Sequence, residues 1–290
     1  MIEAMLYEKL PNQGVQCHVC HHRCVIQPGH RGICAVRENQ NGILMAINYG
    51  LTISAAIDSI EKKPLYHFLP GSNIYSFATV GCNMRCSWCQ NFEISQHPKP
   101  NKRILGTPIT PEEHIKRAID SKCPSIAYTY SEPTIFVEYA LETMKLAKAS
   151  GLKNVWVTNG FMTLETLEAI TPYLDAANVD FKGPDDLVYQ PYCGAFTQPI
   201  MDNLVYLYQK GVHLEITTLV IPGVNDKPEQ IKAIATFIAR KLSPQVPWHL
   251  SRFFPAWKLF STPITPYKTL LMAQTIGQEA GLLNIHLGNV

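Results

Sequence analysis

Residues 78–89 read ATVGCNMRCSWC and place three cysteines, Cys82, Cys86 and Cys89, directly after an apolar β-rich run at 73–80. Iron–sulfur clusters are bound by cysteine thiolates, usually four of them. Three thiolates on so short a loop can hold a cubane cluster and leave one iron without a protein ligand. The alternatives are a zinc knuckle that lacks its fourth ligand, or three unrelated buried cysteines. Because catalytic metal sites keep an open position, we predict a catalytic [4Fe–4S] cluster here.

After Gly71 the sequence alternates β-rich apolar runs with amphipathic helical stretches. This alternation predicts an α/β fold with a parallel sheet and helices outside it. Glycines at 151, 211 and 281 follow three of the expected helices, where left-handed C-terminal caps are common. The expected strands span 73–80, 125–130, 154–158, 177–181, 213–221, 248–254 and 284–287, and the expected helices lie near 111–121, 134–149, 163–173, 199–210, 228–241 and 267–280.

Polar and turn-forming residues follow the expected strands at the points where these strands end. Ligands of parallel α/β folds bind at the carboxyl ends of the strands, so these residues should share one rim. The sequence therefore predicts a ligand site built from Gly81-Cys82, Ser131-Glu132-Pro133, Asn159-Gly160, Asp180-Phe181-Lys182, Pro222-Gly223 and Arg252 to Pro255.

The C-x3-C-x-aromatic-C loop, with Trp88 before its last cysteine, resembles the signature of the radical S-adenosylmethionine (SAM) superfamily. The resemblance extends over about residues 71–290 and implies a partial (β/α)6 barrel of the TIM type. It also implies that a [4Fe–4S] cluster passes an electron to SAM, which splits to methionine and a 5′-deoxyadenosyl radical. An electron donor such as a flavodoxin or a ferredoxin is the implied partner.

The resemblance also implies which residues bind SAM. Glu132 matches the glutamate that receives the SAM amino group; the alternative is a surface turn before a helix. Asn159-Gly160 and Asp180-x-Lys182 are similar to segments of glycyl-radical-enzyme activases, such as the pyruvate formate-lyase-activating enzyme, that contact the ribose and the methionyl carboxylate. For Asp180 and Lys182 the alternative is an ordinary ion pair. The expected SAM-binding residues are Trp88, Glu132, Asn159, Gly160, Asp180 and Lys182.

A closer resemblance covers nearly the whole chain. The motifs at 17–24, 32–37 and 61–68 and the final residues 287–290 are similar to the AmmeMemoRadiSam-system radical SAM family. Many members of that family continue into another cysteine-pair segment, which this sequence does not contain. The reaction of these proteins does not follow from the resemblance.

Residues 1–70 are rich in cysteine, histidine and glycine, and we expect them to form a small metal-binding module before a barrel at 71–290. Four thiolates can close a zinc site or bind a second iron–sulfur cluster, and spacing alone does not distinguish the two. We favour zinc because a closed site suits a structural role; plain thiol packing is the remaining alternative. The four cysteines are Cys17, Cys20, Cys24 and Cys34.

The composition is that of an ordinary globular protein, with a formal net charge of +2 and nine cysteines in 290 residues. The charge gives no reason to expect nucleic acid or a membrane as a partner. The N-terminus lacks a signal-peptide pattern and no apolar run is long enough to cross a bilayer, so we expect a cytoplasmic protein. Lys62, Lys63 and His67 could reach the barrel mouth, although a solvated linker is the simpler interpretation. The isolated Cys123 and Cys193 are interpreted as packing residues.

Together these observations predict a radical SAM enzyme that abstracts hydrogen from an unidentified substrate. The substrate is either a partner protein activated by a glycyl radical or a small molecule. The rival hypothesis is a non-catalytic metalloprotein, either an iron–sulfur electron carrier or a zinc-binding module.

Overall fold

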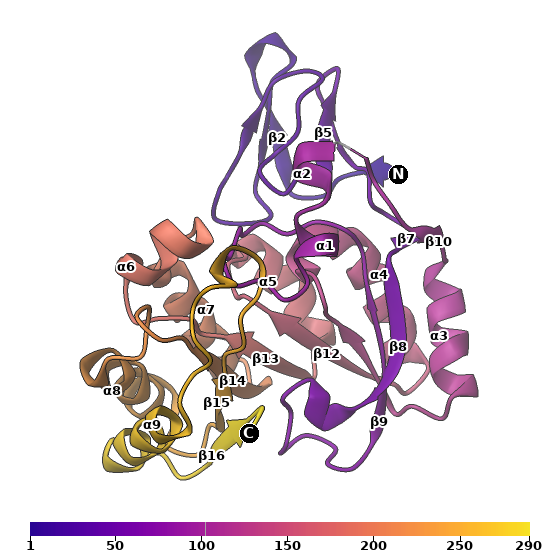
Figure 1. The fold of residues 1–290 in the computed structure, drawn as a ribbon. Helices are drawn as coiled ribbons and strands as arrows, with labels where there is room; N and C mark the ends of the chain where they lie inside the picture. Colours follow the sequence, from indigo (N-terminus) through magenta and orange to yellow (C-terminus); the bar gives the residue numbers. More distant parts are fainter. Residues whose placement is uncertain (102) are drawn as a thin grey trace.

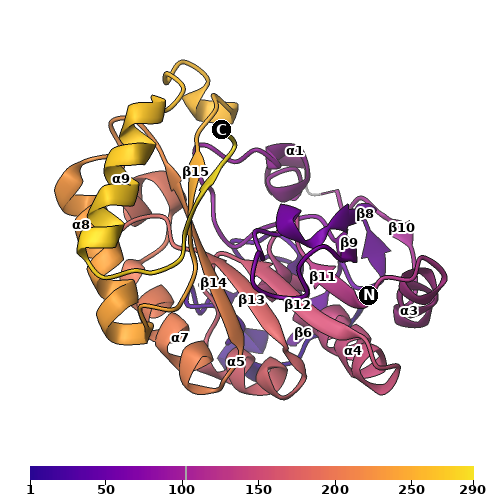
Figure 2. The same ribbon diagram turned by 90° about the horizontal axis from the view of Figure 1, so that it is seen from below.

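Eight strands form one curved sheet with helices on its outer side, as Figure 2 shows most clearly. The computed structural model describes residues 1–101 and 103–290. All neighbouring strands of this sheet run parallel except β8, which pairs antiparallel with β9 at one end. The order across the sheet is β16-β15-β14-β13-β12-β11-β9-β8. In sequence order the strands are β8 (Ser54–Ser59), β9 (Asn73–Ala78), β11 (Ser125–Tyr128), β12 (Lys153–Thr158), β13 (Ala176–Asp180), β14 (His213–Val220), β15 (Trp248–Arg252) and β16 (Ile285–Gly288).

The predicted fold class is confirmed, and the predicted strands are all present, with boundaries that differ by at most two residues. The helices that follow the strands are α3 (Pro111–Asp120), α4 (Val137–Ala149), α5 (Leu164–Ile170), α7 (Thr197–Gln209), α8 (Pro228–Phe237) and α9 (Tyr267–Glu279). The glycines after α4, α7 and α9 have φ of 76°, 75° and 96°, which is the left-handed conformation expected at these caps. Among the described residues, no helix is long and apolar enough to cross a membrane.

The N-terminal residues form two small antiparallel sheets that stand at one end of the barrel (Figure 1). Their strands are β1 (Ile2–Glu3), β6 (Ile43–Ala46) and β5 (Arg37–Gln40) in one sheet, and β2 (Tyr7–Lys9), β3 (Val15–Cys17) and β4 (Val25–Ile26) in the other. Strand β7 (Leu51–Thr52) pairs with β10 (Thr107–Pro108). The division of the chain at residue 70 stays a prediction. Strand β8 lies before that division but pairs with β9, so the N-terminal segment contributes one strand to the barrel sheet.

A buried ion pair joins this N-terminal region to α4. The Arg37 guanidinium donates two hydrogen bonds to the Glu138 carboxylate, at 2.8 and 2.7 Å, and the Met5 amide donates a third at 2.9 Å. Both side chains are almost fully buried. Because leaving either charge without its partner costs about 3–5 kcal/mol, the pair favours this one placement of the region on the barrel.

The end of the barrel interior opposite the cysteine loop is closed by residues 64–68. The Glu215 carboxylate, fully buried near the start of β14, accepts the amide hydrogens of Tyr66 and His67 at 3.0 and 2.8 Å. It also pairs with the imidazoles of His213 and His249 at 3.0 and 2.6 Å. The Glu215 carboxylate therefore holds residues 64–68, which connect β8 to β9, at the floor of the barrel, meaning the end opposite the cysteine loop.

This arrangement predicts a pH-dependent contribution to stability. Burial alone would raise the pKa of Glu215, but the four hydrogen bonds hold it at about 2. Since an unfolded glutamate has a pKa of about 4.3, this group contributes about 3 kcal/mol that is fully present above about pH 5 and lost as the pH falls towards 2. Glu215→Gln should therefore lower the free energy of unfolding at pH 7 and reduce its fall between pH 6 and pH 3, measured by urea denaturation. Glu229→Gln, on the exposed face of α8, is the control. Equal pH profiles for the Glu215 variant and the native chain would contradict this account.

Candidate functional site

The three loop cysteines and the carboxyl ends of the strands line one cavity of about 330 Å³. Sequence reasoning placed all of these groups on a single rim, and the structure brings most of them together. The expected residues that line the cavity are Cys82, Cys86, Cys89, Trp88, Glu132, Asn159, Asp180 and Lys182. Gly160 is not among the lining residues. A Cβ there would stand 3.0 Å from Val179 and 3.2 Å from Ile200, so packing already accounts for this glycine.

Asn159 connects the cysteine loop to the end of β12. Its side-chain amide donates to the Asn83 carbonyl oxygen Oδ1 at 2.8 Å and lies 3.9 Å from the Cys82 sulfur. Its own Oδ1 accepts the Phe161 amide at 3.0 Å, which fixes the direction of the side chain. Asn159 therefore holds the first cysteine of the loop beside the strand end.

Glu132 is buried and carries four hydrogen bonds. Oε1 accepts from the amide and hydroxyl of Thr134, at 3.1 and 2.6 Å, and from the Thr158 hydroxyl at 2.6 Å. Oε2 accepts the Asn159 amide at 2.8 Å. Burial raises the pKa of this carboxyl, and these bonds oppose the rise. Oε1 accepts three of these bonds and Oε2 only one, so Oε2 keeps an acceptor position for a SAM amine.

Lys182 and Asp180 form an ion pair on the cavity wall, with 2.9 Å between Nζ and Oδ2. The lysine side chain is 11% exposed, whereas the aspartate is 42% exposed. Lys182 thus presents a positive charge with little water around it, and a point charge of this kind suits a carboxylate ligand.

The wall beside Glu132 contains a charged group of which sequence reasoning named only Lys63. Asp58 on β8 accepts the Tyr130 hydroxyl and the Lys63 ammonium, both at 2.6 Å, and Lys63 lies 4.4 Å from the centre of the Tyr130 ring. Tyr130 adopts φ of 60°, a left-handed conformation that is uncommon for a residue other than glycine. Lys62 and Lys63 line the cavity. His67 instead bonds His286 at 2.8 Å on the barrel floor. The mixed sequence SAAIDS at 54–59 gave no clear signal for β8.

The N-terminal region packs directly behind the cysteine loop. The His22 Nε2 lies 2.7 Å from the Asn83 carbonyl oxygen and donates to it. Gly81 has φ of 104°, and a Cβ there would stand 2.8 Å from Val36 and 3.1 Å from the Cys34 carbonyl oxygen. The loop can therefore take this path only with glycine at position 81.

The four N-terminal cysteines line a second, much smaller cavity of about 10 Å³, and a shared metal site there stays a prediction. All four are free thiols. Burial raises the pKa of Cys20 and Cys34, and neighbouring thiols raise them further. In the described part of the chain, no three Cys, His, Asp or Glu side chains already stand at the separations that one metal ion requires.

The fold and the cysteine loop define a class of protein. The sequence profile of the Radical SAM superfamily matches residues 77–238, more than half of the chain, which therefore belongs to this superfamily. "Uncharacterized protein MJ0808" of Methanocaldococcus jannaschii is 43% identical over 290 residues, covering all of this chain and 86% of that protein. The pyruvate formate-lyase-activating enzyme of Clostridium pasteurianum is 26% identical over 192 residues, covering 64% of this chain and 77% of that enzyme.

A solved radical SAM methyltransferase from Sphaerobacter thermophilus has a TM-score of 0.56 at 15% identity, covering 77% of this chain and 68% of that one. This similarity concerns the fold alone. The resemblance to the superfamily and to the pyruvate formate-lyase-activating enzymes is confirmed, and membership implies a [4Fe–4S] cluster and SAM as cofactors.

The cavity suits these cofactors. Three free thiols meet it on one side, and the ion-paired Lys182 meets it on another. The Ser131 hydroxyl, which also lines it, is buried and has no hydrogen-bond partner in the protein. A buried hydroxyl without a partner is costly, so a polar ligand in the cavity would stabilise it.

The packing behind the loop predicts a specific effect of Gly81→Ala. The added methyl group would force the loop away from Val36 and Cys34, so both the thermal stability and the iron taken up on anaerobic reconstitution should fall. Gly71→Ala is a matched control, because Gly71 also has positive φ, of 77°, but has nothing within 4 Å of the added Cβ. Equal losses in the two variants would show that backbone strain, and not contact with the N-terminal region, sets the requirement.

Proposed function

We propose that this protein reductively cleaves SAM at a [4Fe–4S] cluster bound by Cys82, Cys86 and Cys89, and uses the resulting radical to remove hydrogen from a substrate. The single observation that carries the proposal is that these three free thiols open into the same cavity as the strand-end residues expected to bind SAM. When bound, the cluster supplies the electron that splits SAM into methionine and a 5′-deoxyadenosyl radical.

The chain's own residues bind and orient SAM in this proposal. Lys182 attracts the methionyl carboxylate, and its pairing with Asp180 fixes the position of the ammonium group. Asn159, which lines the cavity, matches the ribose-contacting segment of related activases, and Gly160 serves the packing at this strand end. Glu132 holds Thr158 and Asn159 in place and receives the SAM amine at Oε2, which accepts only the Asn159 amide from the described residues. Trp88 covers the cavity beside Cys89, and its burial keeps water from that wall.

Two substrate classes fit the cavity. The cavity extends from the cysteine loop to both ends of the eight-stranded sheet. At one end it reaches Lys62 and Lys63, which follow β8. At the other end it reaches Ser251 on β15 and Asn289 after β16. Strands β8 and β16 stand at opposite ends of the sheet order, so the barrel sheet is not closed, and we propose that a segment of a partner protein enters at this edge. This feature, together with the pyruvate formate-lyase-activating relative, favours activation of a partner protein by a glycyl radical. Modification of a small molecule is the second candidate. A flavodoxin or ferredoxin would supply the electron, and a reducing cytoplasm suits the free thiols.

For the N-terminal cysteines we propose a closed zinc site. A cavity of about 10 Å³ has room for roughly one atom-sized occupant, whereas a cubane cluster is far larger. Binding would draw Cys17, Cys20, Cys24 and Cys34 together around the ion. Metal analysis of the reconstituted chain should give one zinc that Cys20→Ser removes, with the iron content unchanged. About eight irons per chain would instead indicate a second cluster.

The catalytic proposal predicts SAM cleavage that depends on the loop cysteines. After anaerobic reconstitution with iron and sulfide, the native chain should convert SAM to 5′-deoxyadenosine when dithionite is added. Cys86→Ala should give no product above background, because it removes a cluster ligand. Cys123→Ala is the matched control, since Cys123 is buried far from the cavity lining and should leave the rate unchanged. A spectroscopically intact cluster that cleaves no SAM would overturn the proposal and favour an electron carrier.

A further inference from the structure

Cys193 is buried against the cluster loop, although it is distant from it in the sequence. The Arg85 amide donates to the Cys193 carbonyl oxygen at 2.8 Å, and the Ser87 amide donates to the Tyr192 carbonyl oxygen at 2.9 Å. These two hydrogen bonds lie on either side of Cys86. The segment that carries Cys193 therefore runs beside the middle cysteine of the loop.

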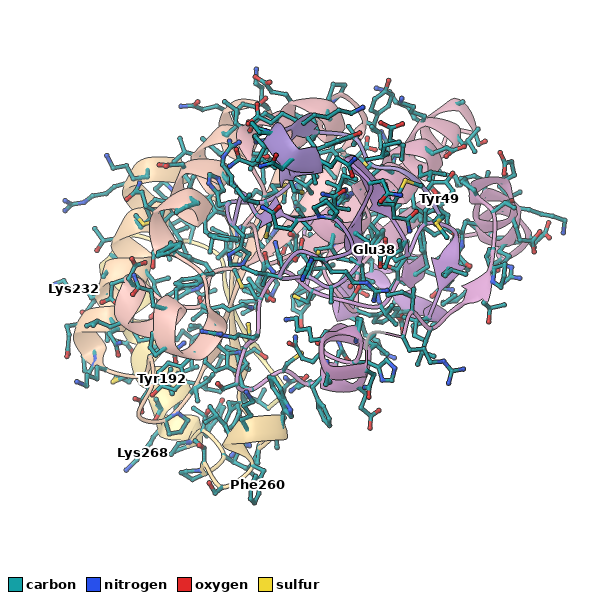
Figure 3. All side chains as sticks on the ribbon, turned by 90° about the horizontal axis from the view of Figure 1, so that it is seen from above. Glu38, Tyr49, Tyr192, Lys232, Phe260 and Lys268 are labelled. Atoms are coloured by element: carbon teal, nitrogen blue, oxygen red, sulfur yellow. The ribbon has the colours of Figure 1, made fainter. Side chains whose placement is uncertain are left out.

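The local backbone fixes this placement. Tyr189–Cys193 forms a π-helical turn, a feature that recurs at functional sites, and Gly194 leaves it with φ of 69°. A Cβ on Gly194 would stand 2.7 Å from the Arg85 Nε. At the other end of the turn, the Tyr189 hydroxyl accepts the Lys182 amide at 2.9 Å. Figure 3 shows Tyr192 on the same side of the molecule as Phe260.

The Cys193 thiol is fully buried and lies beside the Cys86 thiol, on a segment whose backbone accepts the amides on both sides of Cys86. The charged groups that face this pair are the Lys182 ammonium and the Asp180 carboxylate. The sulfur of the other isolated cysteine, Cys123, instead lies 3.9 Å from the Ser121 carbonyl oxygen. Thiol packing explains Cys123, whereas Cys193 lies beside a predicted cluster ligand.

We propose that the Cys193 thiol donates an S–H···S hydrogen bond to the Cys86 thiolate when Cys86 ligates the cluster, and thereby raises the reduction potential of the cluster. The proposal rests on the proposed function, because it requires the cluster at Cys82, Cys86 and Cys89. Reduction adds one negative charge that is spread over the cluster and its sulfur ligands. A donor to a ligand sulfur stabilises that added charge, so the reduced state becomes easier to reach. Cys193 acts through Cys86 and touches neither SAM nor substrate in this account.

The experiment is a redox titration followed by electron paramagnetic resonance, performed on the reconstituted full chain without SAM. Cys193→Ala should shift the midpoint potential to a more negative value. The expected change is about threefold to tenfold in the reduction equilibrium, and the upper limit corresponds to about 59 mV for a one-electron couple. Cys193→Ser keeps a donor of nearly the same volume and should restore most of the native potential. Cys123→Ala should leave the potential unchanged.

Three results would overturn the proposal. The first is a native midpoint potential in Cys193→Ala, and the second is an equal shift in Cys123→Ala. The third is loss of iron from both Cys193 variants while their metal-free forms melt like the native chain, which would make Cys193 a cluster ligand and not a hydrogen-bond donor.

If the native chain itself assembles no cluster, the proposed function fails first and this inference fails with it. If Cys193→Ala does not fold, Cys193→Ser and Cys193→Val are compared instead. A native midpoint potential in Cys193→Ser and a more negative one in Cys193→Val would support the hydrogen bond.

Discussion

Loop 79–91 carries three thiol groups on a backbone that forms no strand or helix, so other elements must hold it. Three sets of hydrogen bonds do this. Asn159 and His22 bind Asn83 from opposite sides, the 192–193 segment binds the amides of Arg85 and Ser87, and Lys99 and Gln96 donate to the Met84 carbonyl oxygen. The loop is thus fixed around Cys82 and Cys86 before any cofactor binds, which lowers the entropy that binding would otherwise cost.

The same constraint explains why the N-terminal region belongs to the site. Val36 and the Cys34 carbonyl oxygen form the surface against which Gly81 packs, and the Arg37–Glu138 pair fixes that surface on α4. A metal at the N-terminal cysteines would then stiffen the support of the cluster loop, without contact with SAM. The floor is fixed separately, because Glu215 ties residues 64–68 across the start of β14. The cysteine loop therefore depends on the N-terminal region for its support, whereas the floor of the barrel depends on residues 64–68 and Glu215.

The sequence was sufficient to predict the parallel strands, because each is a short apolar run that is buried in the sheet. It was also sufficient to collect Cys82, Glu132, Asn159 and Lys182 at one rim, since parallel strands end on the same side. Strand β8 was missed because it is an edge strand with a mixed, half-exposed sequence, SAAIDS. The Asp58–Tyr130–Lys63 group and the Cys86–Cys193 contact were missed because they join residues that only the closed fold brings together. Spacing along a chain carries no signal for such pairs.

The central claim is that the three loop cysteines leave one iron of the cluster open to SAM. Electron paramagnetic resonance of the dithionite-reduced cluster, recorded before and after addition of SAM, tests this claim most directly. The account predicts that SAM changes the g values, and that SAM labelled with ¹⁷O at its carboxylate or ¹⁵N at its amine gives a hyperfine coupling to the cluster. An intact reduced cluster whose spectrum is the same with and without SAM, and which shows no such coupling, would contradict it.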